Sequence, residues 1–176
     1  MSEAERSAAD NIPEEHKQYN YTNGCKYDGM WRANRRHGQG KFIWPSGAIY
    51  VGEFKNDRRN GNGKIDYSDG SAYDGEWKND LKDGRGKYTW PEGAVYEGQF
   101  RDDQMHGEGC FRWESQACYE GSWRHNKKNG PGRMTYKDSS TYEGTWRDDK
   151  RHGEGTMRWT NGTSYEGFFE DDIRHG

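Results

Sequence analysis

The chain has 176 residues and a formal net charge of -3 at pH 7, which suits one compact domain or one short repeat array and does not favour a nucleic-acid partner. Hydrophobic residues make up only 28% of the chain, a share that usually indicates disorder, but Trp 8, Tyr 12 and Phe 6 can build an aromatic core instead. No apolar run is long enough for a signal peptide or a membrane span, and three cysteines without a paired pattern favour a reducing compartment, so we expect a cytoplasmic protein.

Residues 1–17 are polar and acidic, and Pro13 would limit any helix among them. We therefore expect a flexible or short helical N-terminal segment there. From residue 18 to residue 176 the same positions recur every 23 residues, which predicts a single repeat array.

The first strand of each repeat carries a tyrosine, a glycine and a second aromatic residue at every second position. Alternation with period two is typical of a β-strand with one dry face and one wet face. The tyrosines are Tyr27, Tyr50, Tyr73, Tyr96, Tyr119, Tyr142 and Tyr165, and the second aromatic residues are Trp31, Phe54, Trp77, Phe100, Trp123, Trp146 and Phe169. The glycine between them leaves a gap that a ring from a neighbouring strand could fill.

A second strand follows in each repeat, after a Gly-x-Gly pair, and it carries apolar residues two apart. These pairs are Phe42/Trp44, Ile65/Tyr67, Tyr88/Trp90, Phe111/Trp113, Met134/Tyr136 and Met157/Trp159. One period before the first pair lie Tyr19 and Tyr21, so the first hairpin begins near Gln18. The pattern predicts an all-β fold, an elongated array of about seven antiparallel hairpins that forms a twisted open sheet or gutter.

The turns that lead into each tyrosine strand contain pairs such as Asn23-Gly24, Asp69-Gly70 and Asn161-Gly162, which supply the positive φ of tight hairpins. Ser115-Gln116 and Asp138-Ser139 lack the glycine, so we expect looser or different turns there. After Phe169 the sequence breaks off within the motif, and we expect an unpaired strand edge.

The sequences Tyr142-Glu143-Gly144-Thr145-Trp146 and Arg151-His152-Gly153-Glu154-Gly155 resemble the membrane-occupation-and-recognition-nexus (MORN) repeat. The resemblance covers residues 18–176; Asn60, Asp83 and Asn129 depart from its histidine and Val51 from its acidic residue. It implies a twisted sheet of hairpins that acts as a scaffold in cytoskeletal assemblies, cilia, flagella and membrane junctions, or as an appendage of some enzymes. It brings no catalytic residues.

Candidate metal, phosphate and catalytic sites have simpler explanations. The column of His37, His106, His152 and His175 also accepts Asn and Asp, which favours a left-handed turn position over a metal site. The Gly-x-Gly pairs have no following helix and are not expected to bind phosphate, and the acidic residues recur on a charged face. Cys25 and Cys118 occupy columns of small packing residues. We expect no catalytic residue, no metal and no cofactor.

The sequence therefore predicts a non-catalytic protein-binding scaffold that holds a helix or extended peptide in an aromatic-glycine groove. The candidate protein-binding aromatic residues are Trp44, Tyr67, Trp77, Trp90, Trp113, Trp123, Tyr136 and Trp146. The sequence leaves open which of them are exposed. From the resemblance we expect a place in the cytoskeleton, in the axoneme of a cilium or flagellum.

Three alternatives stay open. Self-association could use the unpaired edge strands. A phospholipid-binding, membrane-tethering module would use the basic loops at Arg35-Arg36-His37, Arg58-Arg59 and Lys127-Lys128, but aspartates share those loops, so we expect weak or no lipid binding. The chain could also be a regulatory repeat region of a larger assembly.

Overall fold

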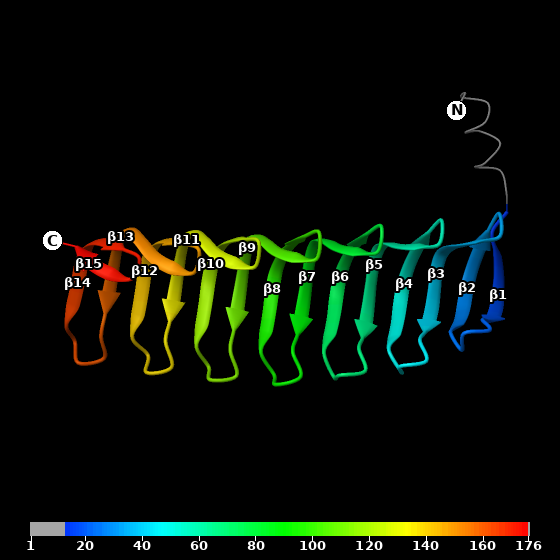
Figure 1. Ribbon diagram of the computed structural model, residues 1–176, viewed down its shortest axis with the longest axis horizontal. Helices are drawn as coiled ribbons and strands as arrows, with labels where there is room; N and C mark the ends of the chain where they lie inside the picture. The colour runs from blue at the N-terminus through cyan, green and yellow to red at the C-terminus, as the bar shows by residue number, and fades with distance from the viewer. Residues whose placement is uncertain (1–12, 176) are drawn as a thin grey trace, which may run out of the picture. The chain divides into compact units, whose positions relative to one another are not determined.

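The structure is a computed structural model that describes residues 13–175 (Figure 1). Its contacts divide the chain into two compact units, with the boundary in the sequence between Leu81 and Lys82. The regular elements of the described residues are all β-strands, and each strand pairs antiparallel with the strands beside it in sequence. The prediction of an all-β fold with an open antiparallel sheet of hairpins is confirmed.

Strand bounds follow the 23-residue period in both units. The first unit contains β1 (Glu15–Asn20), β2 (Lys26–Arg32), β3 (Arg35–Ile43), β4 (Ile49–Lys55), β5 (Arg58–Asp66) and β6 (Ala72–Lys78). At its end begins β7 (Leu81–Thr89), and the second unit continues with β8 (Val95–Arg101), β9 (Gln104–Arg112), β10 (Cys118–Arg124), β11 (Lys127–Thr135), β12 (Thr141–Arg147), β13 (Lys150–Arg158), β14 (Ser164–Glu170) and β15 (Ile173–His175).

The N-terminal end of the array differs from the sequence prediction. Strand β1 begins at Glu15, where it pairs with Trp31, so residues 15–17 belong to the first hairpin and not to an N-terminal segment. The rest of the predicted N-terminal segment, residues 1–12, lies outside the described residues. The C-terminal tail turns back and adds β15 to β14, because cross-strand pairing satisfies backbone groups that an open edge would leave to water.

Two kinds of turn alternate along the chain. The turn at Ala33 and Asn34 has φ values of 49° and 60°, and positive φ at both central residues is the requirement of a type I′ turn. The same conformation recurs at the equivalent residue pairs 56–57, 79–80, 102–103, 125–126, 148–149 and 171–172. These tight two-residue turns were not recognised from the sequence, because most of them use Asn and Asp without glycine.

The turns that precede each tyrosine strand are longer and have positive φ only at one residue. At the second of these turns, Gly47 has φ 93° and its N–H donates to the carbonyl of Trp44 at 2.9 Å. Gln116 and Ser139 each have φ 70° and make the same hydrogen bond, at 3.0 and 2.9 Å, to Trp113 and Tyr136. The prediction of looser turns at these two places is wrong, since the flanking strands impose the left-handed conformation on a non-glycine residue.

The core is a row of tyrosine rings laid over glycine. Tyr50 is 0% exposed, and its hydroxyl donates to the carbonyl of Glu53 at 3.0 Å. Its ring lies over Gly63, where an added Cβ would be 2.2 Å from the tyrosine Oη and 2.5 Å from Cζ. Only glycine leaves this space. The glycine under the ring is therefore Gly63 of the Gly-x-Gly pair, and not Gly52 of the tyrosine strand, where the gap was predicted and where an added Cβ would lie 2.4 Å from the Gly63 backbone.

Neighbouring repeats join through edge-to-face ring contacts. The Tyr50 ring packs against Phe54 at 5.1 Å and against Trp77 of the next repeat at 5.5 Å, with interplanar angles of 86° and 88°. Tyr119 makes the same two contacts with Trp123 and Trp146 in the second unit, at 5.1 and 5.4 Å. Aromatic pairs favour this geometry, so rings replace the aliphatic core that the composition lacks.

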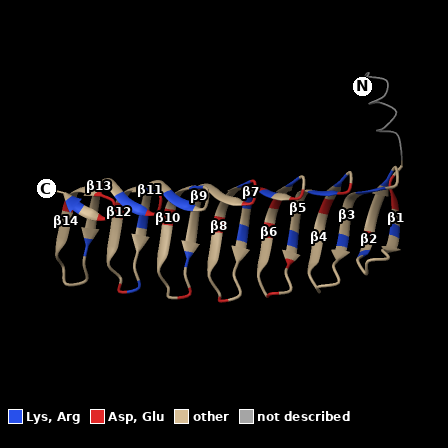
Figure 2. Cartoon of the chain, in the orientation of Figure 1, with Lys and Arg blue, Asp and Glu red and all other residues tan. Residues whose placement is uncertain are grey.

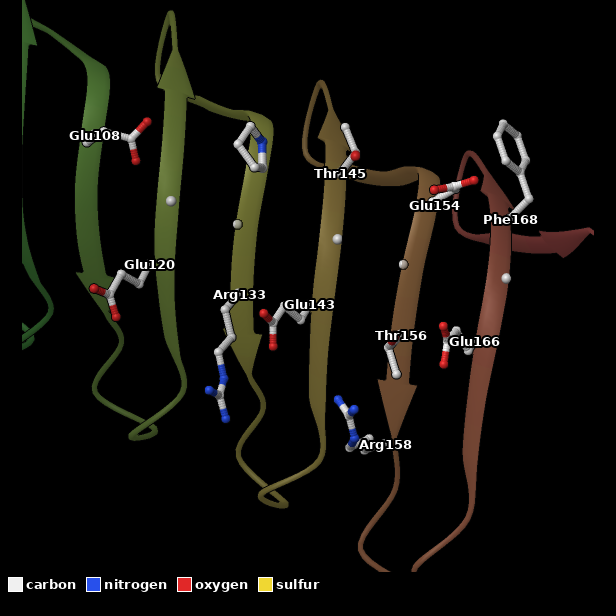
Figure 3. A pocket seen from close by; sticks show the side chains of 16 residues that line it. Glu108, Glu120, Arg133, Glu143, Thr145, Glu154, Thr156, Arg158, Glu166 and Phe168 are labelled. Atoms are coloured by element: carbon white, nitrogen blue, oxygen red, sulfur yellow. The ribbon is translucent and has the colours of Figure 1, made fainter.

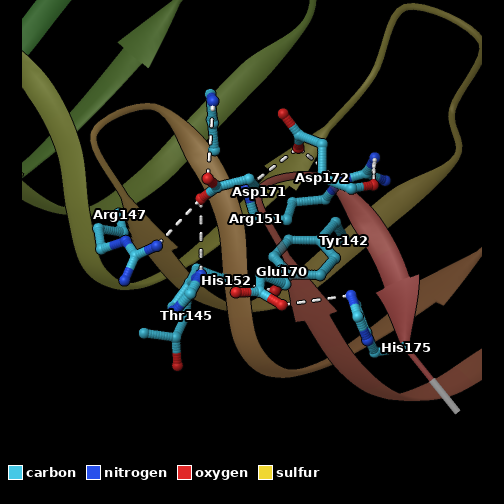
Figure 4. A network of polar contacts seen from close by, with 10 residues as sticks. Tyr142, Thr145, Arg147, Arg151, His152, Glu170, Asp171, Asp172 and His175 are labelled. Carbon is cyan, nitrogen blue, oxygen red and sulfur yellow. Dashed lines mark hydrogen bonds and ion pairs between the residues drawn. The ribbon is translucent and has the colours of Figure 1, made fainter.

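Aspartates of the type I′ turns form hydrogen bonds and ion pairs with the preceding hairpin. The Asp172 N–H donates to the carbonyl of Arg151 at 3.0 Å, while its Oδ1 accepts from the Arg151 N–H at 3.1 Å and from Nε at 2.9 Å. The Arg151 guanidinium also lies 5.2 Å from the centre of the Phe169 ring. Figure 4 shows this network at the last repeats, and Figure 2 shows acidic and basic residues side by side along the turns. The turn aspartate therefore holds an arginine whose guanidinium covers a ring of the aromatic core.

Candidate protein-binding surfaces

Three of the eight predicted binding rings belong to the core. Trp77, Trp123 and Trp146 are only 4%, 5% and 4% exposed. The indole N–H of Trp77 donates to the carbonyl of Gly63 at 2.9 Å, and the other two make the equivalent bond. The proposal that these three rings contact a partner is corrected, because each is already packed and hydrogen-bonded inside the array.

The other five predicted rings are half-buried and lie where the long strands end. In the first unit they are Trp44 and Tyr67, and in the second unit they are Trp90, Trp113 and Tyr136. Phe111 lies between Trp90 and Trp113 at 5.0 and 4.5 Å, so these three rings of the second unit form a continuous aromatic row. Their part in binding stays a prediction.

The groove of the second unit lies on the wet face, opposite the tyrosine rings. It has a volume of about 1040 Å³ and crosses the strands from β9 to β14. Figure 3 shows its side chains standing on successive strands, with glycines between them. The charged residues that line it are Glu108, Glu120, Glu143, Glu154, Glu166, Arg133 and Arg158. The predicted aromatic-glycine groove is therefore a polar groove with a glycine floor, because on the other face the tyrosine rings cover the glycines.

Small residues open this groove in the later repeats. The position after the Gly-x-Gly pair is a long side chain at Lys41, Lys64 and Lys87, whereas the later repeats carry Cys110, Arg133 and Thr156, two of which are small. The position after the tyrosine-strand glycine changes from Glu53, Glu76 and Gln99 to Ser122 and Thr145, before it becomes large again at Phe168. This loss of side-chain volume was visible in the sequence, but strand alternation alone classified both columns as a solvated face.

Proline explains one of these exchanges. The Gln99 Oε1 accepts from the backbone N–H of Glu108 at 3.2 Å, which satisfies a donor next to a β-bulge. One repeat later the residue in the place of Glu108 is Pro131, which has no N–H. Ser122 can therefore be short, and its hydroxyl donates instead to the Glu108 carboxylate at 2.6 Å.

Most charges in the groove have no partner among residues 13–175. No ion pair or hydrogen bond among the described residues uses the side-chain carboxylate of Glu120, Glu143 or Glu166, or the guanidinium of Arg133 or Arg158. By contrast, Arg59 beside one of the turns is engaged: its Nε lies 3.2 Å from Asp80 Oδ1 and its guanidinium 4.1 Å from the Trp77 ring centre. Arg36 and Arg151 are paired with aspartates in the same way.

The histidine column lies in strands and not at turn positions. His37, His106 and His152 are within β3, β9 and β13, and the positive φ belongs to the glycine that follows each of them, such as Gly38 at 62°. The turn explanation for these histidines is wrong, since glycine takes the left-handed position at no steric cost. Over residues 13–175 no group of three or more His, Cys, Asp or Glu side chains is placed to hold a metal ion.

The cysteines show no activated thiol. Cys110 and Cys118 lie on paired strands with their Sγ atoms 3.4 Å apart. Burial, and then the neighbouring Cys118 thiol, raise the pKa of Cys110 to about 11, so this group is a thiol at neutral pH. A helix able to cross a membrane, which needs length and apolar character, does not occur within residues 13–175.

Comparisons with solved structures find only distant similarity. The SAS-4 (dCPAP) TCP domain of Drosophila melanogaster, in complex with a proline-rich motif of Ana2 (dSTIL), is 12% identical over 88% of this chain and 90% of that chain, with a TM-score of 0.48. The TCP10 domain of Danio rerio CPAP, in complex with a STIL peptide, is 13% identical over 88% and 84%, with a TM-score of 0.36. A virginiamycin B lyase from Staphylococcus aureus is 10% identical over 92% and 77%, at 0.23. Scores below 0.5 support no functional conclusion.

The family comparison is decisive. A search of curated proteins finds no significant match. The MORN repeat model matches seven consecutive segments, residues 27–49, 50–72, 73–95, 96–118, 119–141, 142–164 and 165–176. These segments begin at the seven repeat tyrosines and have the 23-residue period of the strands. The chain therefore belongs to the MORN repeat family.

Proposed function

We propose that this chain is a non-catalytic protein-binding scaffold, and that the groove across β9–β14 holds a segment of a partner protein. The observation that carries this proposal is the groove itself: about 1040 Å³ of open space over a glycine floor, with unpaired charges along it. Clefts of this size with a few placed polar groups are typical binding sites. The cytoskeletal, ciliary or flagellar setting is part of the proposal and rests on the scaffold role that the MORN resemblance implies.

The alternative of phospholipid binding receives less support from the side chains. Its candidate cations include Arg36 and Lys128. Arg36 Nε lies 3.4 Å from Asp57, and its guanidinium lies 4.9 Å from the Phe42 ring centre. The Lys128 ammonium lies 4.3 Å from the Trp146 ring centre. Membrane attraction needs several free Lys and Arg residues near the surface, and these two are turned to the core instead.

The test fills the groove without disturbing the dry face. Thr145 and Thr156 both line the groove on the wet face, so a Thr145→Trp/Thr156→Trp variant should block it and keep the fold. A Trp90→Ala/Trp113→Ala variant removes half-buried rings of the aromatic row as the matched comparison. Each form is immobilised, exposed to an extract of ciliated cells and to anionic vesicles, and the captured proteins are identified by mass spectrometry.

We expect discrete proteins to bind the wild type and to be lost from the groove-filled variant, with direct binding reproduced by each purified partner. Loss only from the ring variant would move the binding site to the aromatic row. Vesicle binding by all three forms, with no protein captured, would replace the scaffold by the membrane-tethering alternative.

Self-association stays a separate prediction. Strand β15 lies at the end of the described residues and carries Ile173, which is 67% exposed. An exposed apolar residue beside an open strand edge favours edge-to-edge pairing. Sedimentation at increasing concentration tests this, and a mass that stays at that of the monomer contradicts it.

A further inference from the structure

We infer that the partner segment held by the β9–β14 groove is rich in lysine or arginine. This inference rests on the proposed function and adds the chemistry of the partner to it. The groove is lined by five glutamates and only two arginines, so a formal charge of -3, as large as that of the whole chain, is concentrated along it. An acidic or neutral segment would gain nothing from these carboxylates, whereas a basic segment pairs with them.

The negative charge arises because the repeats lose their cations but keep their acids. The residue after each repeat tyrosine stays acidic along the second unit, at Glu97, Glu120, Glu143 and Glu166. The strand that pairs with it carries lysine at Lys87, but the equivalent positions are Cys110, Arg133 and Thr156. Two of the three cations of a regular wet face are therefore missing inside the groove.

The pairing register shows which carboxylates this leaves without a partner. Glu120 faces Cys110 on one side and Arg133 on the other, while Glu166 faces Thr156. Glu143 faces Arg133 and Thr156, and no ion pair among the described residues joins Arg133 to either acid. These exposed carboxylates can accept a cation from a partner without first breaking an internal bond.

The spacing of these glutamates suits an extended segment. Glu120, Glu143 and Glu166 lie on β10, β12 and β14, which are alternate strands, so they recur at about 9–10 Å across the sheet. An extended polyproline II chain rises about 3.1 Å per residue and returns to the same side every third residue, which is also about 9 Å. A segment with a lysine or arginine at every third position therefore presents one cation to each glutamate. The glycine floor, including Gly132 and Gly155, leaves room for its backbone.

The test measures peptide binding to the full chain by fluorescence anisotropy. The probe is a labelled twelve-residue peptide of four Lys-Pro-Pro units, compared with Gln-Pro-Pro and Glu-Pro-Pro peptides of the same length. We expect binding of the lysine peptide alone, weakening as salt is raised. Because exposed ion pairs are individually weak, the Glu120→Gln/Glu143→Gln/Glu166→Gln variant is expected to lose affinity on the order of 10- to 100-fold.

The control variant Glu92→Gln/Asp102→Asn/Glu114→Gln removes the same charge from exposed positions outside the groove, and we expect it to bind within about twofold of the wild type. Equal loss in both triple variants, equal binding of the Gln-Pro-Pro peptide, or no binding of the lysine peptide would overturn the inference. The proposed function has its own readout, since the groove-filled Thr145→Trp/Thr156→Trp variant must lose its partner whatever charge that partner carries. If that variant keeps the lysine peptide at full affinity, the groove is not the site and both proposals fall.

Discussion

Replacing Gly63 by alanine should expel a core ring and destabilise the array. The new Cβ would lie 2.2 Å from the Oη and 2.5 Å from the Cζ of Tyr50, about 1 Å inside ordinary contact with the ring. The ring cannot move aside, because Phe54 and Trp77 pack against it at 5.1 and 5.5 Å. Since removing a large buried aromatic residue costs about 3–5 kcal/mol, we expect Gly63→Ala to lower the free energy of unfolding by about 3 kcal/mol.

Urea unfolding followed by tryptophan fluorescence measures this change, and a double-mutant cycle identifies its cause. Tyr50→Ala alone should cost about 3–5 kcal/mol, and adding Gly63→Ala to it should cost little more, because the ring that the new methyl group meets is gone. Gly47→Ala is the control for backbone strain alone: no atom lies within 4 Å of its added Cβ, but its φ is 93°, so we expect a loss of about 1 kcal/mol. If the Tyr50 and Gly63 changes are additive, the account of the ring over glycine is wrong.

Three further changes test the turns, the links between repeats and the core. Gln116→Gly and Ser139→Gly should each raise the free energy of unfolding by about 0.5–1 kcal/mol, and the melting temperature with it, because both residues have a φ of 70°. An unchanged melting temperature would show that this conformation carries no strain. Asp149→Ala should lower the free energy of unfolding by about 1–2 kcal/mol, because it removes the acceptor for the Lys128 N–H at 2.9 Å. Asp149→Asn should change the free energy of unfolding by under about 0.5 kcal/mol, since Asn126 makes the same bond one repeat earlier. Equal losses in the two variants would contradict this link between repeats. Burial raises the pKa of Tyr27 from 10.0 to about 12, so the stability from its protonated ring is complete below pH 10 and is lost as the pH rises towards 12; phenolate absorbance and circular dichroism should change together there, and ordinary titration of every tyrosine near pH 10 would refute this.

The repeat pattern was enough to predict the strands, but it assigned the space for a ring to the tyrosine-strand glycine, whereas the ring lies over the glycine of the neighbouring strand. Aromatic residues two apart, with a 23-residue period, can satisfy only one kind of element, because successive side chains of a strand point to opposite faces. The type I′ turns escaped the prediction, since Asn56 and Asp57 tolerate positive φ without the glycine that marks such turns in sequences. The start of β1 at Glu15 was not predicted either, because strand pairing continues on the N-terminal side of Tyr19, the first aromatic residue of the pattern.

The binding surface divides in the same way between sequence and structure. The sequence by itself determined that the chain is a MORN array with a dry aromatic face and a wet charged face, because the period-two pattern assigns every side chain to a side. Only the tertiary structure decided that Trp77 is core while Trp90 is half-buried, since both lie on the dry face but Trp77 packs against Tyr50 and bonds to Gly63 of the preceding repeat. It also showed that Glu120, Glu143 and Glu166 line one groove, because residues 23 apart come close only when the sheet places their strands two positions apart.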